Sequence, residues 1–110
     1  MTDKIAVMIV DDHPVFRQGL RNVLAVHEDI SIVGEATDGP EAIEQAQELL
    51  PDVVVMDINL PTLNGLQATR RLKARCQEVN VIMLTAYDDE EQVYHAIRAG
   101  AAAYYSKDVS

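Results

Sequence analysis

Residues 5–12 read IAVMIVDD, an apolar run of six residues that ends in two aspartates. Residues 53–57 read VVVMD, a second apolar run that ends in a third aspartate. If both runs are parallel strands of one sheet, Asp11, Asp12 and Asp57 meet beyond the same edge, where open α/β sheets bind ligands. Carboxylates crowded together repel one another unless a cation lies between them. The pattern therefore predicts a magnesium site around an aspartate that can accept a phosphoryl group.

Short apolar runs alternate with helical patterns along the chain. Several of these runs are apolar at nearly every position and rich in valine and isoleucine, as strands covered on both faces should be. Alternation of strand and helix gives right-handed crossovers, so we expect an α/β fold with a doubly wound parallel sheet. The predicted strands are residues 5–10, 30–36, 53–56, 79–84 and 102–105.

The helices between these strands carry their own start and stop signals. Pro14 is suited to open the first helix, and Asp38 to cap the second with Glu41 three residues later. The third is predicted to follow Asn64 and Gly65. The fourth is predicted to begin at position 88 or 89 and to end at Gly100.

Composition limits the classes of function. The chain has 110 residues, which we interpret as a single domain over residues 1–110. Its net charge of −9 makes direct binding of nucleic acid by this segment a poor match. The single cysteine, Cys76, allows no internal disulfide, which fits a reducing compartment. We see no signal-peptide layout and no apolar run that could span a bilayer, so we expect a cytoplasmic location away from the membrane.

Two further polar residues follow predicted strands. Thr85 follows the fourth strand and supplies a hydroxyl, and Lys107 follows the fifth and supplies a positive charge that can hold a phosphate oxygen. Either residue alone would be an ordinary strand-end or surface side chain. Together with the three aspartates they provide a nucleophile, a metal site, a cation and a hydrogen-bond donor, which is the set needed for phosphoryl transfer. His13 is interpreted as a helix-entry residue, because magnesium prefers oxygen ligands.

This constellation resembles the receiver domain of two-component response regulators, the CheY-like family. The resemblance covers essentially the whole chain, and its finer details are similar to the NarL/LuxR-like subfamily. It implies a flavodoxin-like, five-stranded parallel sheet in the order 2-1-3-4-5. We expect the fifth helix of that fold to be absent from this chain. The residues that carry the subfamily resemblance are Asp11-Asp12-His13-Pro14, Phe16-Arg17, Gly19-Leu20, Gly100-Ala101 through Tyr104, and Lys107-Asp108.

The resemblance also implies roles for single residues. Asp57 would be the phosphoacceptor, with a sensor histidine kinase as the phosphoryl donor. Mg²⁺ would be held by Asp12, Asp57 and the backbone carbonyl of Asn59, with Asp11 acting mainly through water. Such a domain is a switch that promotes its own phosphorylation and dephosphorylation rather than an enzyme with an external substrate.

The remaining implied roles concern the conformational switch. Thr85 would bond the phosphoryl group, and Tyr104 would swing inward behind it. Lys107 would contact a phosphoryl oxygen. Asn59 and Tyr87 would flank the acyl phosphate and influence its hydrolysis.

Two alternatives stay open at this stage. One is a binding module that keeps the fold and works without phosphorylation. The other is an aspartyl-phosphate hydrolase of the haloacid dehalogenase type, in which a second aspartate two residues after the nucleophile acts as the general acid. Asn59 occupies that position here.

The missing helix leads to two expectations. It should leave apolar sheet surface uncovered, so we expect self-association, for instance as a homodimer through that face, or reduced stability. In the subfamily that the chain resembles, a DNA-binding domain usually follows the receiver. Control of transcription would then belong to a longer parent protein.

Overall fold

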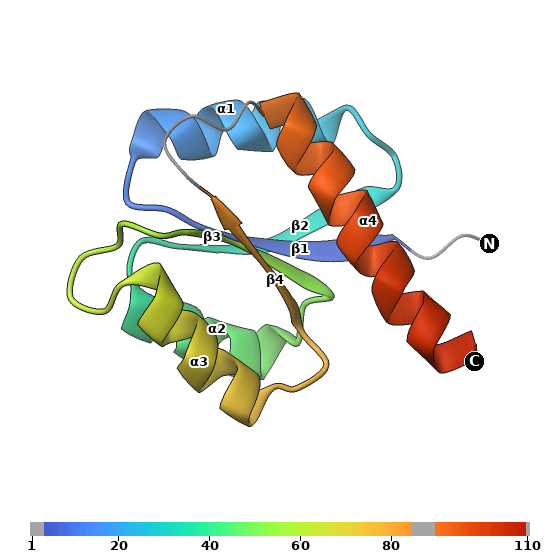
Figure 1. The fold of residues 1–110 in the computed structure, drawn as a ribbon. Coiled ribbons are helices and arrows are strands. Elements are labelled where there is room, and N and C mark those ends of the chain that lie inside the picture. The colour runs from blue at the N-terminus through green and yellow to red at the C-terminus, as the bar shows by residue number, and fades with distance from the viewer. Residues whose placement is uncertain (1–3, 85–89, 110) are drawn as a thin grey trace.

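The structure, a computed structural model, describes residues 4–84 and 90–109, with side chains as far as residue 100. Strands and helices alternate along these residues, as the sequence predicts (Figure 1). The elements are β1 (Ile5–Val10), α1 (Pro14–Ala25), β2 (Ile30–Ala36), α2 (Gly39–Leu49), β3 (Val53–Asp57), α3 (Gly65–Arg75), β4 (Asn80–Leu84) and α4 (Glu90–Val109).

The strands form one parallel sheet in the order β2-β1-β3-β4. The α/β class, the parallel sheet and the relative order of its first four strands are thereby confirmed. The register places Val10 beside Met56, so β1 and β3 end together. Asp57 in turn lies beside Leu84 of β4. The residues that follow these three strands therefore start from one edge of the sheet.

Helices cover both faces of the sheet (Figure 1). Alternate strand residues point to opposite faces, and each set packs into its own apolar cluster. Val7, Ile9, Val53 and Val55 pack with residues of α1 and α4. The other cluster joins β1 and β3 to α2 and α3 through Met8, Val10, Val54 and Met56. Burial on both faces explains why β1 is apolar at every position and β3 at every position before Asp57.

Local capping accounts for where the helices begin. The Asp38 side chain accepts a hydrogen bond from the Glu41 backbone N–H at 2.8 Å and caps α2. At α3, Asn64 accepts from the Gln67 N–H, and the Gln67 side chain accepts from the Asn64 N–H, which makes a complete capping box. Pro14 occupies the first turn of α1, where its missing N–H costs nothing. The predicted starts of these three helices are confirmed.

The predicted fifth strand is wrong for this structure. Residues 102–105 lie within α4, which continues without a break from Glu90 to Val109. Gly100 does not end the helix either, and no described glycine has a positive φ, the conformation of a helix-ending glycine. Four alanines at positions 99 and 101–103 favour the helix, because alanine has the highest intrinsic helix propensity. A strand at the same place would need pairing and cover from distant parts of the chain.

The position of α4 also bears on the expected uncovered surface. Val93 and Ile97 of α4 are buried against the sheet beside Leu20 and Leu24 of α1. Among the described residues, no large apolar face of β1 or β3 is left open. In the same part of the chain, no helix is both long and apolar enough to cross a membrane.

Candidate functional site

The carboxyl end of β1 delivers two aspartates with different exposures. The Asp11 backbone N–H continues the sheet by donating to the Ala36 carbonyl at 3.1 Å, which fixes Asp11 in a buried position. Its carbonyl accepts from Arg17 Nη1 at 2.8 Å, which ties the strand end to α1. Asp12 follows with an exposed side chain. One carboxylate is therefore held inside the site while the other stands at its rim.

Asp57 is the last residue of β3, and its side chain is only 9% exposed. Its Oδ1 accepts a hydrogen bond from the Asn59 backbone N–H at 3.1 Å. Gly65 packs directly against this turn, and its N–H donates to the Ile58 carbonyl at 2.9 Å. A Cβ atom on Gly65 would overlap the Asp57 carbonyl oxygen and lie 2.8 Å from the Ile58 Cα. The close approach of α3 thus holds the strand end that carries Asp57.

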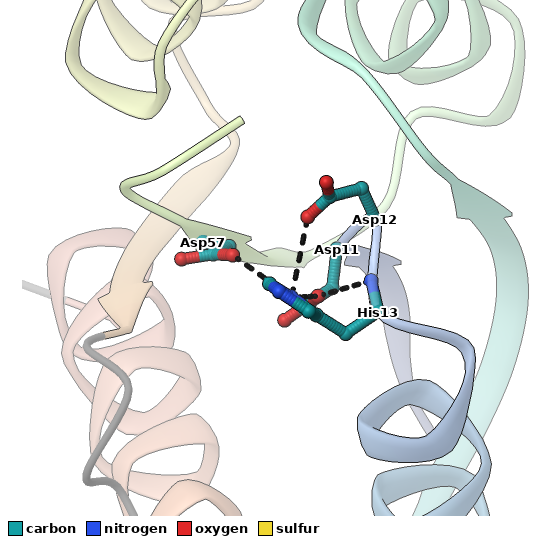
Figure 2. A group of neighbouring side chains, drawn as sticks. All are labelled: Asp11, Asp12, His13 and Asp57. Carbon is teal, nitrogen blue, oxygen red and sulfur yellow. Dashed lines mark hydrogen bonds and ion pairs between the residues drawn. The ribbon is translucent and has the colours of Figure 1, made fainter. Parts of the chain in front are cut away.

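The three carboxylates converge on the ring of His13 (Figure 2). His13 Nδ1 lies 2.8 Å from Asp11 Oδ1, 3.2 Å from Asp12 Oδ1 and 3.7 Å from Asp57 Oδ2. The His13 backbone N–H also donates to Asp11 Oδ1 at 2.8 Å. The predicted meeting of the three aspartates at one sheet edge is confirmed. The helix-entry role expected for His13 is confirmed, since His13 is the N-cap residue of α1, and its ring lies among the carboxylates in addition.

The electrostatics of the cluster show in two pKa values. Burial raises the pKa of Asp57 above its ordinary value, the Asn59 N–H opposes this, and the neighbouring Asp11 and Asp12 add to it. The pKa of His13 is raised by its hydrogen bond to Asp11 and by the charges of Asp12 and Asp11. Burial is the main cause of the Asp57 shift, and the negative charge of the neighbouring carboxylates contributes to both shifts.

The residues present fit a divalent cation. Asp11, Asp12, His13 and Asp57 each offer a ligand atom, and these four atoms lie within 4.8 Å of one another. Asp57 Oδ2, on a carboxylate that is nine-tenths buried, has only His13 at 3.7 Å as a cationic neighbour among the described residues. A buried carboxylate oxygen without a close donor matches a group that completes its coordination with a metal.

A cleft of about 420 Å³ opens above the cluster. Apolar atoms of Val15 and Phe16 form one wall, and Asn59 and Glu90 contribute polar groups. Val15 in this wall is 87% exposed. The carboxylates are therefore open to an incoming group of moderate size.

The other predicted site residues are not all brought to this edge. Thr85 and Tyr87 lie outside the described residues, although Thr85 directly follows Leu84, the partner of Asp57. Tyr104 and Lys107 belong to the second half of α4. This helix passes the opposite edge of the sheet, since Asn80 Nδ2, at the start of β4, donates to the Gly100 carbonyl at 3.2 Å. The structure does not bring the Lys107 backbone to the carboxylates.

Comparison with known proteins agrees with the fold. Residues 7–110 match the response regulator receiver domain family. The chain belongs to this family. The receiver is 40% identical over 107 residues to the transcriptional regulatory protein DegU of Brevibacillus brevis, and 39% identical over 106 residues to the response regulator protein VraR of Staphylococcus saprophyticus. It spans about half the length of these relatives, 45% and 51%, with 97% and 96% of its own residues aligned.

Solved structures give the same result. The signal receiver domain of the putative response regulator NarL from Mycobacterium tuberculosis superposes with a TM-score of 0.73 at 31% identity, over 93% of this chain and 78% of that one. The response regulator domain of Thermotoga maritima CheB superposes with a TM-score of 0.73 at 37% identity, over 92% and 72%. The receiver fold predicted from the sequence is thereby confirmed, as is the likeness to NarL-type regulators.

Proposed function

We propose that this receiver accepts a phosphoryl group on Asp57 from the phosphohistidine of a sensor histidine kinase. The observation that supports the proposal is the environment of Asp57 Oδ2. This oxygen belongs to a nine-tenths buried carboxylate, lacks a close donor among the described residues and borders an open cleft. A nucleophile held in place but not capped by a hydrogen bond is ready for attack.

The transfer balances without a further reactant. Asp57 Oδ2 attacks the phosphorus, a P–O bond forms, and the P–N bond to the kinase imidazole breaks. The electron pair of the broken bond returns to the imidazole nitrogen. The hydrogen bond from the Asn59 N–H to Oδ1 orients the carboxylate so that Oδ2 faces the cleft. Hydrolysis of the acyl phosphate by water reverses the modification, so the domain acts as a switch on itself.

The same proposal includes Mg²⁺ as the cofactor. Asp12, Asp57 and the Asn59 carbonyl would hold it, with Asp11 acting through water. The ion would offset the charge of the phosphoryl oxygens beside three carboxylates. Asp11 supports this arrangement through its buried position and its bonds to the His13 N–H and to Arg17.

Thr85, Tyr104 and Lys107 are proposed to respond to the phosphoryl group. Thr85 would donate its hydroxyl to a phosphoryl oxygen, and Tyr104 would fill the space behind it. For Lys107 to pair with the group, the segment after Gly100 has to leave α4, because the helix carries it past the far edge of the sheet. A near-complete shift of this kind needs about 5.5 kcal/mol of differential binding.

The output is proposed to lie in a longer parent protein. The relatives are named as transcriptional and response regulators, and the chain spans about half of their length. We infer a cytoplasmic receiver domain that controls transcription through another part of that protein, and that does not bind nucleic acid itself. Self-association as a homodimer stays part of the proposal, and sedimentation at several concentrations tests it.

The test of the phosphoacceptor role compares wild type with Asp57→Asn. With Mg²⁺ and a small phosphoryl donor such as phosphoramidate, intact-mass spectrometry should show one added phosphoryl group on wild type and none on the variant. Beryllofluoride with Mg²⁺ should shift the amide NMR spectrum of wild type only. Asp12→Asn keeps the acceptor and should be modified more slowly.

Two results would point elsewhere. Equal modification of the Asp57→Asn variant would overturn the assignment of the acceptor. Repeated turnover of a simple phosphomonoester would favour the hydrolase alternative.

A further inference from the structure

The geometry points to His13 as a protein ligand of the proposed metal, one that makes this receiver favour imidazole-binding first-row metal ions, such as Ni²⁺, over Mg²⁺. The inference rests on the proposed function in so far as the two share one metal site. It assigns a new role to a residue that a magnesium site of oxygen ligands would not use.

The direction of the His13 side chain supports its role as a metal ligand. His13 stands at the N-cap of α1, yet its side chain makes no capping hydrogen bond to the helix. Its ring instead points into the carboxylate cluster, as Figure 2 shows. The side chain is 66% exposed, but its Nδ1 lies 2.8 Å from Asp11 Oδ1 rather than near a free N–H group of the helix.

The spacing of the ligand atoms also supports metal binding by His13. Neighbouring ligands around an octahedral ion with bonds of about 2.1 Å lie about 3 Å apart. His13 Nδ1 is 3.2 Å from Asp12 Oδ1 and 3.7 Å from Asp57 Oδ2. The ligand atoms of the cluster all lie within 4.8 Å of one another, so octahedral spacing would require these side chains to move closer together. The histidine would then occupy a position that Mg²⁺ fills with water.

The chemistry of the donor set determines which metal ions the site favours. Carboxylates alone suit Mg²⁺, whereas an imidazole nitrogen suits metals later in the first row, whose affinity rises from Mn²⁺ to Ni²⁺. Binding through Nδ1 requires the neutral ring to carry its proton on Nε2. The bond from Nδ1 to Asp11 is then given up, which frees Asp11 to act through water.

Metal binding itself tests the inference, without phosphorylation. Calorimetric titration of the receiver with MgCl₂, MnCl₂ and NiCl₂, at about pH 8 so that free imidazole is neutral, gives a Kd for each ion. In His13→Ala, Ni²⁺ should bind at least about tenfold more weakly, while the Kd for Mg²⁺ stays within about twofold. His13→Gln should behave like His13→Ala, because its amide is a poor substitute for imidazole.

A matched control and a direct readout complete the experiment. His95 is exposed on α4 away from the cluster, so His95→Ala should bind all three ions like wild type. Electron spin-echo modulation of bound Mn²⁺ should show a coupled nitrogen in wild type and in His95→Ala but not in His13→Ala.

The inference is overturned if that nitrogen signal is absent from wild type, or if His13→Ala weakens Ni²⁺ and Mg²⁺ equally. Either result leaves the beryllofluoride response of Asp57 untouched. Conversely, loss of that response with metal selectivity intact would refute only the phosphoacceptor role.

Discussion

The ring of Tyr94 stacks on the ring of His27, with centroids 3.5 Å apart and planes within 12° of parallel. Tyr94 Oη also donates to the Asp29 carboxylate, 3.2 Å from each oxygen, and Arg98 Nη1 donates to Tyr94 Oη at 3.1 Å. Arg98 and Asp29 form an ion pair at 2.9 Å. These contacts attach α4 to the segment that connects α1 and β2. The two parts of the chain are far apart in the sequence.

Removing the Tyr94 hydroxyl should loosen this attachment. Tyr94→Phe keeps the stacking on His27 but deletes the bonds to Asp29 and Arg98, so we expect a loss of about 1 kcal/mol in the free energy of unfolding. Urea denaturation measures it. A double-mutant cycle with Asp29→Asn should show that the two losses are not additive. Fully additive losses would mean that the hydroxyl contributes nothing through Asp29.

Gly65→Ala should destabilise the fold and disturb Asp57. The added methyl would meet the Asp57 carbonyl, the Ile58 Cα and the Met83 Cε, the last two at 2.8 Å. Backbone cannot yield as a side chain can, so we expect a cost of about 1–3 kcal/mol, together with slower phosphorylation. Thermal unfolding and mass spectrometry measure the two effects.

Gly19→Ala is the matched control for Gly65→Ala. Gly19 lies inside α1, and in the part of the chain that the structure describes its added methyl would meet only the end of the Glu90 side chain, 3.1 Å away. That side chain can move, and alanine favours the helix by up to about 1 kcal/mol. Stability should therefore be unchanged or higher. Equal losses in both variants would show that the contact at Gly65 is not special.

Gly100→Ala tests the continuous α4. Among the described residues, the nearest atom to the added methyl is Ile82 Cδ1 at 3.8 Å, an ordinary contact. Within a helix, the substitution should stabilise the protein by about 0.5–1 kcal/mol. If Gly100 instead ended the helix with a positive φ, as the sequence suggested, the same substitution would destabilise it. The sign of the change in melting temperature separates the two structures.

Asp57→Asn should stabilise the protein at neutral pH. Burial and the neighbouring carboxylates raise the pKa of Asp57 in the folded state above its ordinary value of 3.8. Protonated Asp57 does not destabilise the folded state, so the stability linked to this group is fully present below pH 3.8. This stability is lost as the pH rises through the folded-state pKa and Asp57 becomes charged. The variant should melt roughly 4 °C higher at pH 7, for about 1 kcal/mol, and this gain should vanish on acidification. Glu44→Gln, at an exposed position on α2, should show neither effect.

The carboxylate cluster could be predicted because strand direction alone determines it. Asp11 and Asp57 follow apolar runs that must be buried on both faces, and parallel strands bring their carboxyl ends to one edge. The position of His13 could not be predicted in this way. Its ring direction depends on the backbone at the N-cap of α1 and on three carboxylates from two strands, and only the assembled site contains them.

In the second half of α4, the structure differs from the prediction made from the sequence pattern. Residues 102–105 were predicted as a strand from their place in the alternation and from the family resemblance. Their alanine-rich surroundings favour a helix through purely local interactions, whereas a fifth strand depends on distant pairing with β4. Lys107 lies away from the site for this reason.

Among the described residues, β4 pairs with β3 alone, so its outer side is a sheet border. Symmetry restricts what can occupy this border. Two copies related by a twofold axis would place their β4 strands antiparallel, whereas every existing pair in this sheet is parallel. A closed dimer through β4 would therefore create a mixed sheet. An added parallel strand has to come from the chain's own later residues or from a head-to-tail neighbour, which would lead to open-ended association.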